Sequence, residues 1–185
     1  IVEPLLALLD DGSPDVVREA ATSLSRTADP RVGPRLISLI ESRADLRDTL
    51  LATLEGNVGA PGIATVLAST QNEALRLQLV QRLKDLHDPR GADALWAELQ
   101  RTPAPAPLAA PAAPAAPGAG PTPADLLANA ARTRVERLRL EAIRGLVQLG
   151  DRRVIAVLSG MLSAPGDDRV LLDDVLTESA RLGRL

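Results

Sequence analysis

The stretch RLEAIRGLVQLGDRRVIAVLSGML, residues 139–162, has the pattern of two short amphipathic helices joined by a turn. Its first part places apolar residues three and four positions apart, as on one buried helical face. Asp151 marks the turn, because an aspartate side chain can accept hydrogen bonds from the free N–H groups that begin a helix. The apolar spacing resumes at Val154 and predicts a second helix.

The same pattern recurs along the chain at a period of about 30 residues, which is typical of stacked repeat proteins. The repeats are aligned by taking Val17, Arg47, Arg76 and Arg139 as position zero. Position +4 then holds Ala21, Leu51, Val80 and Ile143; position +7 holds Leu24, Leu54, Leu83 and Leu146; position +19 holds Leu36, Val66, Leu95 and Leu158. These columns predict the buried core.

The turns between the two helices follow the same alignment. Three repeats carry aspartate at position +12, followed by Pro or Arg at +13, and proline at the first position of a helix loses no hydrogen bond. The second repeat instead has Gly59-Ala60-Pro61, so we expect its turn to be looser.

The two segments VVREAATSLSRTADPRVGPRLISLI (residues 16–40) and 139–162 resemble the bacterial HEAT-like repeats, a class of about 30 residues also found in phycobilisome lyases. This resemblance covers most of the chain outside a proline-rich interruption. It implies an all-α fold, an α-solenoid of stacked two-helix repeats. The shared motifs are capping and core residues, so the resemblance implies a fold more strongly than an activity.

The interruption is the uncharged stretch 102–124, TPAPAPLAAPAAPAAPGAGPTPA, which holds eight of the fifteen prolines. Prolines this close together exclude a helix. We therefore divide the chain into HEAT-like repeats at 1–101, a mobile Pro/Ala-rich insertion at 102–122, and a long basic helix with the remaining repeats at 123–185.

Several boundaries stay open within this division. Residues 123–149 form one long helix or two shorter ones, and the last repeat starts at either Arg169 or Leu172. Residues 1–10 match half a repeat through Leu6 and Leu9, and the last repeat stops before a second helix. We expect the chain to be a fragment of a larger protein, open at its C-terminus.

Composition excludes several kinds of site. The chain has no cysteine and one histidine, which excludes thiolate zinc sites, cysteine nucleophiles and multi-histidine metal sites. One tryptophan and no other aromatic residue cannot form a base-stacking platform, and a net charge of −3 argues against binding duplex DNA. We expect no catalytic residue, cofactor, metal or nucleic acid. No segment is suited to span a membrane, and a cytoplasmic location is favoured, although a targeting signal could lie outside the fragment.

One candidate partner-binding surface is a row of arginines at position +14. Arg31, Arg90 and Arg153 occupy this position, and stacking would align them; Arg35 and Asp93 follow about one helical turn later. The row either binds acidic groups of a protein partner or consists of solvated arginines beside the aspartate caps.

A second candidate is the basic face of the long helix, with Arg132, Arg134, Arg137 and Arg144. It either binds an acidic partner or forms pairs with glutamates one turn away on the same helix.

The sequence thus predicts a non-catalytic protein–protein interaction scaffold whose partner is a protein. Two alternatives remain: an enzyme subunit of the bilin-lyase type, which the resemblance implies, and, with less support, a HEAT-fold DNA-binding module. His87 and Trp96 are interpreted as a turn residue and a core residue.

Overall fold

The computed structural model describes residues 2–27, 29–102, 123–163, 173 and 176–177, and the regular structure among them is helical, without strands. The helices are α1 (Val2–Leu8), α2 (Pro14–Leu24), α3 (Val32–Ser42), α4 (Arg47–Val58), α5 (Ala60–Ser69), α6 (Glu73–Leu86), α7 (Ala92–Arg101), α8 (Pro123–Gln148) and α9 (Val154–Ser163). Two short 3₁₀ helices, η1 (Ala44–Leu46) and η2 (Pro89–Gly91), precede α4 and α7. The predicted all-α fold is confirmed.

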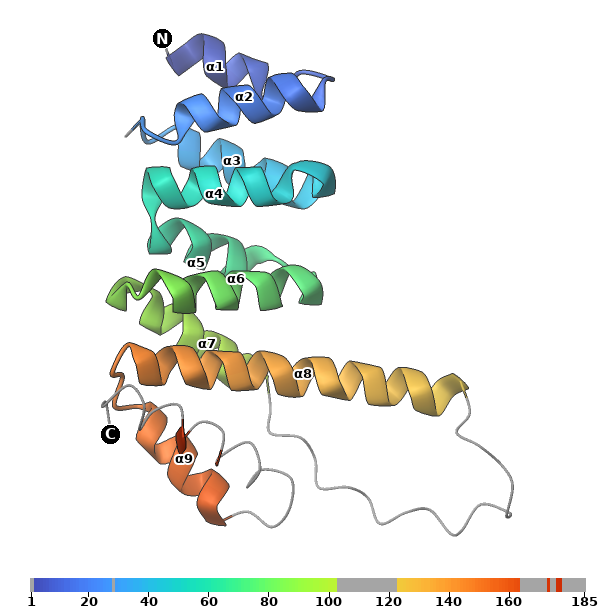
Figure 1. The fold of residues 1–185 in the computed structure, drawn as a ribbon, viewed down its shortest axis with the longest axis vertical. Coiled ribbons are helices and arrows are strands. Elements are labelled where there is room, and N and C mark those ends of the chain that lie inside the picture. The colour runs from blue at the N-terminus through green and yellow to red at the C-terminus, as the bar shows by residue number, and fades with distance from the viewer. Residues whose placement is uncertain (1, 28, 103–122, 164–172, 174–175, 178–185) are drawn as a thin grey trace. The chain divides into compact units, whose positions relative to one another are not determined.

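The helices follow one another as the predicted pairs (Figure 1). Repeat 1 consists of α2 and α3, repeat 2 of α4 and α5, repeat 3 of α6 and α7, and repeat 4 of α8 and α9, while α1 precedes repeat 1. None of the described helices has the length and apolarity that crossing a membrane would require.

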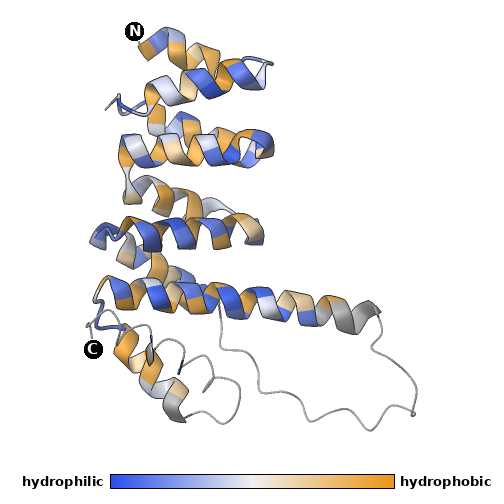
Figure 2. Ribbon diagram, viewed as in Figure 1, coloured by the Kyte–Doolittle hydropathy of each residue, from blue (hydrophilic) through white to orange (hydrophobic). Residues whose placement is uncertain are grey.

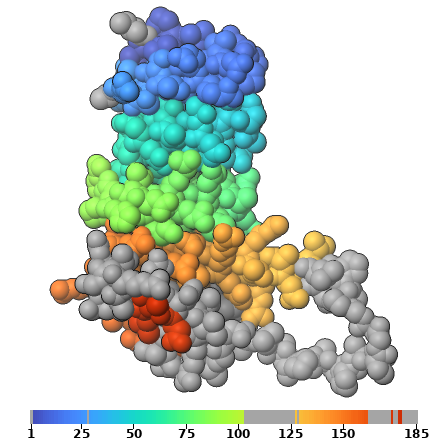
Figure 3. Space-filling model, viewed as in Figure 1, coloured from blue at the N-terminus to red at the C-terminus, as the bar shows by residue number. Residues whose placement is uncertain are grey.

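The chain divides into two compact units, Ile1–Ala94 and Leu95–Leu185. In the first unit the helices stack in two layers: α2 packs on α4, and α3 packs on α5. Four consecutive pairs also contact each other: α1 with α2, α3 with α4, α4 with α5, and α5 with α6. The space-filling view shows this unit as successive bands in chain order (Figure 3). In the second unit, α8 contacts α9.

The three core columns are buried, as predicted. In repeats 1 to 3, Leu24, Leu54 and Leu83 at position +7 are fully buried, as are the +4 and +19 residues of the same repeats. In the second unit, Leu146 and Ile143 are buried in α8. Apolar and polar residues alternate along most of the helices (Figure 2). Burial of these aliphatic columns supplies the main stabilising free energy.

The turn of repeat 2 contradicts the expected loose connection. Gly59 alone separates α4 from α5, and its φ of +73° is in a region that L-residues rarely adopt. The two helices then lie very close, because a Cβ on Gly62 would be 3.0 Å from side-chain atoms of Leu54 and Val58. The prediction was wrong because a positive-φ glycine reverses the chain in one residue, without a capping side chain.

Helix α8 is a single continuous helix of 26 residues, which resolves the alternative left open at 123–149. The Pro/Ala-rich stretch from residue 103 to 122 lies outside the described residues, as does most of the last repeat, including Arg169 and Leu172.

Candidate functional site

The turns of repeats 1, 3 and 4 share one arrangement, built by an aspartate and the arginine two residues later. The aspartate Oδ1 accepts the arginine's backbone N–H at 2.9 Å in all three turns. The guanidinium forks the same carboxylate, with Nε–Oδ1 distances of 3.0, 3.1 and 3.0 Å and Nη2–Oδ2 distances of 2.9, 2.7 and 2.5 Å for Asp29–Arg31, Asp88–Arg90 and Asp151–Arg153. Such two-point pairing orients the arginine as well as binding it.

These pairs shift the titration of the aspartates. The hydrogen bonds from the Arg31 guanidinium and backbone N–H lower the pKa of Asp29 to about 2. Hydrogen bonds from Arg90 and Arg153 lower the pKa values of Asp88 and Asp151 in the same way. Each carboxylate is therefore stabilised in its charged form by the turn that it organises.

The predicted arginine row is interrupted in the first unit. Arg31 and Arg90 belong to the turns of repeats 1 and 3, and the turn between them has Pro61 at the equivalent position. Both arginines are exposed. Arg31 also pairs with Glu3 of α1, so its guanidinium joins two carboxylates.

The remaining members of the row differ in their surroundings. Arg35 forms an ion pair with Asp10, and Asp93 lies exposed at the start of α7. In the second unit, Arg153 lies 5.3 Å from the ring centroid of Trp96, a cation–π distance. Trp96 is only half-buried. A partner-binding role for these residues stays a prediction.

Polar contacts between successive repeats were not predicted. The Arg82 guanidinium of α6 lies 2.9 Å from the Glu55 carboxylate of α4, and Gln78 donates to Asp48. The Asn57 amide donates to the carbonyl of Thr27. A signal was present, because these partners are 27 to 30 residues apart, which is about one repeat.

Two surface hollows are described in the first unit. One, of about 410 Å³, lies beside Arg82 and is mainly polar. It is lined by Glu55, Gln78, Gln81, Arg82, Asp85 and Leu86. The other, of about 360 Å³, is mainly apolar and includes Leu5, Leu8 and Val16 of α1 and α2. Among the described residues, no three His, Asp or Glu side chains are grouped so that they could hold a metal ion.

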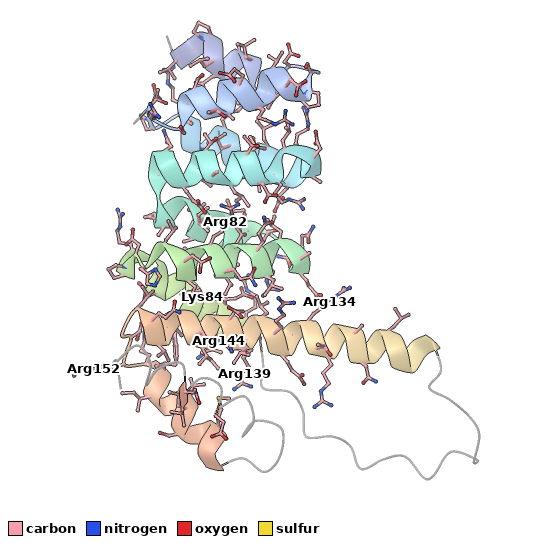
Figure 4. All side chains as sticks on the ribbon, in the orientation of Figure 1. Arg82, Lys84, Arg134, Arg139, Arg144 and Arg152 are labelled. Carbon is pink, nitrogen blue, oxygen red and sulfur yellow. The ribbon has the colours of Figure 1, made fainter. Side chains whose placement is uncertain are left out.

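The arginines of α8 are of two kinds. Arg132 lies 2.7 Å from Glu136, and Arg144 lies 3.1 Å from the buried Glu141. Arg134 and Arg137 are exposed. Arg134 and Arg139 lie on opposite sides of the helix (Figure 4). The basic residues therefore surround α8 instead of forming one continuous patch.

The apolar stripe of α8 changes its exposure along the helix. Leu127, Ala131, Val135, Leu138, Ala142 and Leu146 share one side at helical spacing. Leu138 is 4% exposed, and Ala142 and Leu146 are fully buried. Leu127 is 73% exposed, Ala131 is exposed and Val135 is half-buried. We call residues 127–137 the open half of α8; none of its described side chains is buried.

Sequence periodicity did not predict that the stripe is exposed at Leu127 and buried at Leu138, because periodicity identifies the apolar side of a helix but not what covers it.

Comparison with known protein families supports the repeat pattern found in the sequence. The family model for the PBS lyase HEAT-like repeat matches residues 138–163, which span the buried part of α8 and all of α9. No curated protein matches the chain. The matched residues coincide with the stretch that first indicated a two-helix repeat. The match at residues 138–163 and the paired helices of the described residues support a HEAT-like repeat protein.

Proposed function

We propose that the chain is a non-catalytic scaffold that binds a protein partner through its helical surface. The observation that carries this proposal is the change along α8, where one apolar stripe is buried from Leu138 onward and exposed at Leu127. Burying such a side chain against a partner releases water from apolar surface and is favourable. An exposed apolar stripe with a polar border is typical of interaction sites.

The Asp–Arg pairs of the repeats have a structural role, because they hold the turns between helices. In the Asp–Arg turns, hydrogen bonds from the arginine lower the pKa values of Asp29, Asp88 and Asp151. In these turns the shift follows from a two-point ion pair that holds the start of a helix. A lyase role, which the description of the matched family suggests, would need reactive groups with shifted pKa values in a cleft. The structural use of charge in these turns and the exposed stripe of α8 support the scaffold.

Site-specific cross-linking tests this proposal. The chain has no cysteine, so Leu127→Cys provides a single attachment point for a photoactivated cross-linker on the open half of α8. Ile155→Cys is the matched control, because Ile155 is also an exposed aliphatic residue, 54% exposed on α9. Both variants should keep the helical circular dichroism and melting temperature of the parent chain.

The labelled variants are mixed with lysate of the organism that makes the chain, and adducts are identified by mass spectrometry. We expect one defined protein adduct from position 127 and none from position 155. Equal capture at both positions, or no protein adduct at position 127, would contradict the proposal.

A further inference from the structure

We propose that the open half of α8 binds an acidic amphipathic helix of the partner protein. This inference rests on the proposed function and names the chemistry of the partner. It follows from the apolar stripe, from the charges on its two borders and from the helical backbone that presents both.

The stripe provides the apolar contact. Leu127 and Val135 are two helical turns apart on one side, with the small side chain of Ala131 between them. A small residue between two larger ones lets a second helix approach closely, with its own side chains packed into the space above it. The same stripe continues into the buried Leu138. A bound helix would therefore extend a contact that the fold already makes.

The borders of the stripe provide the charge. Residues 127–137 contain three arginines and one glutamate. On a helix that turns roughly 100° per residue, Arg134 and Arg137 lie on one border and Arg132 on the other. The glutamate, Glu136, already pairs with Arg132. Carboxylates on an incoming helix would thus meet Arg134 and Arg137, a complementarity that determines partner choice and orientation.

The backbone of α8 favours a helical partner. Its N–H and C=O groups bond within the helix, so it has no free strand edge on which an extended peptide could pair. The partner must bind through side chains, as helices do when they pack. The exposed stripe is only about two turns long, so the contact belongs among small, transient interfaces.

A membrane surface is the principal competitor, because basic amphipathic helices also bind anionic lipid. Such helices bury Trp, Phe or several leucines in the lipid. The open half offers one leucine and one valine and no aromatic residue. Binding a helix of a partner protein requires less apolar area than insertion into lipid does, because ion pairs at the borders also contribute to recognition.

Binding of synthetic helices to the full chain tests the inference. The probe is a fluorescent 21-residue peptide with leucines at helical spacing and glutamates beside them. One control peptide has every glutamate replaced by lysine, and another has the leucines distributed around the helix. Fluorescence anisotropy should show binding of the acidic peptide, at least about tenfold tighter than binding of either control.

Variants locate the binding site. Leu127→Asp, and separately Arg134→Glu with Arg137→Glu, should each weaken binding of the acidic peptide about tenfold. The double charge reversal should bind the lysine peptide more tightly than the parent chain does. Ile155→Asp and Arg26→Glu are matched exposed controls and should leave binding unchanged. Circular dichroism melting confirms that each variant is folded.

Three results would overturn the inference: no difference between the acidic and lysine peptides, no effect of the α8 variants, or Leu127-dependent binding to anionic phosphatidylserine vesicles without peptide binding. Protein cross-linking at position 127 combined with failure of the acidic peptide would reject this partner chemistry and leave the scaffold function standing. Absence of any protein adduct at position 127 would reject the scaffold function itself.

Discussion

The turn of repeat 2 and the turns of repeats 1, 3 and 4 connect equivalent helices by different means. In the three Asp–Arg turns, a carboxylate accepts the backbone N–H of the arginine two residues later and also binds its guanidinium. In repeat 2 no side chain takes part: the Gly59 N–H donates to the Glu55 carbonyl at 2.9 Å, and the Gly59 carbonyl accepts from Gly62 at 3.0 Å. The same reversal is thus specified by side-chain chemistry in one case and by backbone conformation in the other.

The position of the positive-φ residue explains the difference in turn length. His87, with φ of 51°, and Gly150, with φ of 70°, each end a first helix and are followed by the aspartate of the turn. In repeat 2 the positive-φ residue is Gly59, which takes the place of the aspartate. Ending one helix and beginning the next therefore happen at a single residue. Substitutions in the two kinds of turn should have different costs.

The largest effect is expected for Gly59→Ala. An added Cβ has space, since its nearest neighbour would be the Arg90 guanidinium at 3.7 Å, but a φ of +73° with ψ of −153° is open almost only to glycine. We expect the free energy of unfolding to fall by about 2–3 kcal/mol, measured by urea denaturation. Gly12→Ala, where no atom lies within 4 Å and φ is ordinary, is the control and should change stability little. Equal effects of the two substitutions would remove the distinction between the turns.

A smaller loss is expected for Gly150→Ala in repeat 4. Its φ of +70° costs an L-residue about 1–2 kcal/mol, but the aspartate turn that follows is kept. The control is Gly160→Ala inside α9, where a Cβ would meet nothing within 4 Å. Alanine favours a helix interior, so this control should stabilise the chain by about 0.5–1 kcal/mol. Thermal unfolding of the two variants should shift in opposite directions.

His87→Gly should have the opposite sign to the first two substitutions. Among the residues that the structure describes, His87 is the non-glycine residue with a positive φ. Glycine adopts this conformation without a steric penalty. We expect a gain of about 0.5 kcal/mol in urea denaturation, because relief of the steric cost exceeds the added freedom of the unfolded chain. Destabilisation by this change would show that the His87 side chain contributes more than its backbone strain costs.

The smallest effect at neutral pH is expected for the carboxylates of the Asp–Arg turns. The pKa of Asp29 falls from the usual 3.8 to about 2 in the folded chain, so its contribution is complete above about pH 4 and is lost as the pH falls toward 2. Asp29→Asn should therefore flatten the acid side of the curve of stability against pH, measured by urea denaturation from pH 7 to pH 2. Arg31→Gln removes the partner of the same carboxylate and should flatten the curve similarly. Unchanged curves in both variants would argue against the Asp–Arg pair as the origin of the pKa shift.

Much of the fold could be predicted because repetition supplies several examples of each position. The +7 leucines were identified as core by their recurrence, and they are buried in every described repeat. The Gly59 turn could not be predicted in the same way, because it occurs once and its tightness depends on a φ angle. The exposure of Leu127 also could not be predicted, since its spacing is the same as that of the buried Leu138.

For the arginine row, the sequence predicted which residues occupy position +14 but not the contacts that they make. The +14 column indicated arginines near the aspartate caps, and the structure shows each of them bound to its own cap. Whether two side chains two residues apart form a fork depends on the turn geometry, which composition and spacing do not contain.

The closeness of each aspartate to its arginine has a consequence for how such an array can evolve. Both members of the pair are encoded within three codons, so duplication of one repeat copies the aspartate together with its arginine. Contacts such as Glu55–Arg82 join neighbouring repeats, and insertion of a new repeat between them would separate the two side chains. Gene duplication can therefore add whole repeats that keep their Asp–Arg turns. The polar contacts between neighbouring repeats must be selected again after each duplication.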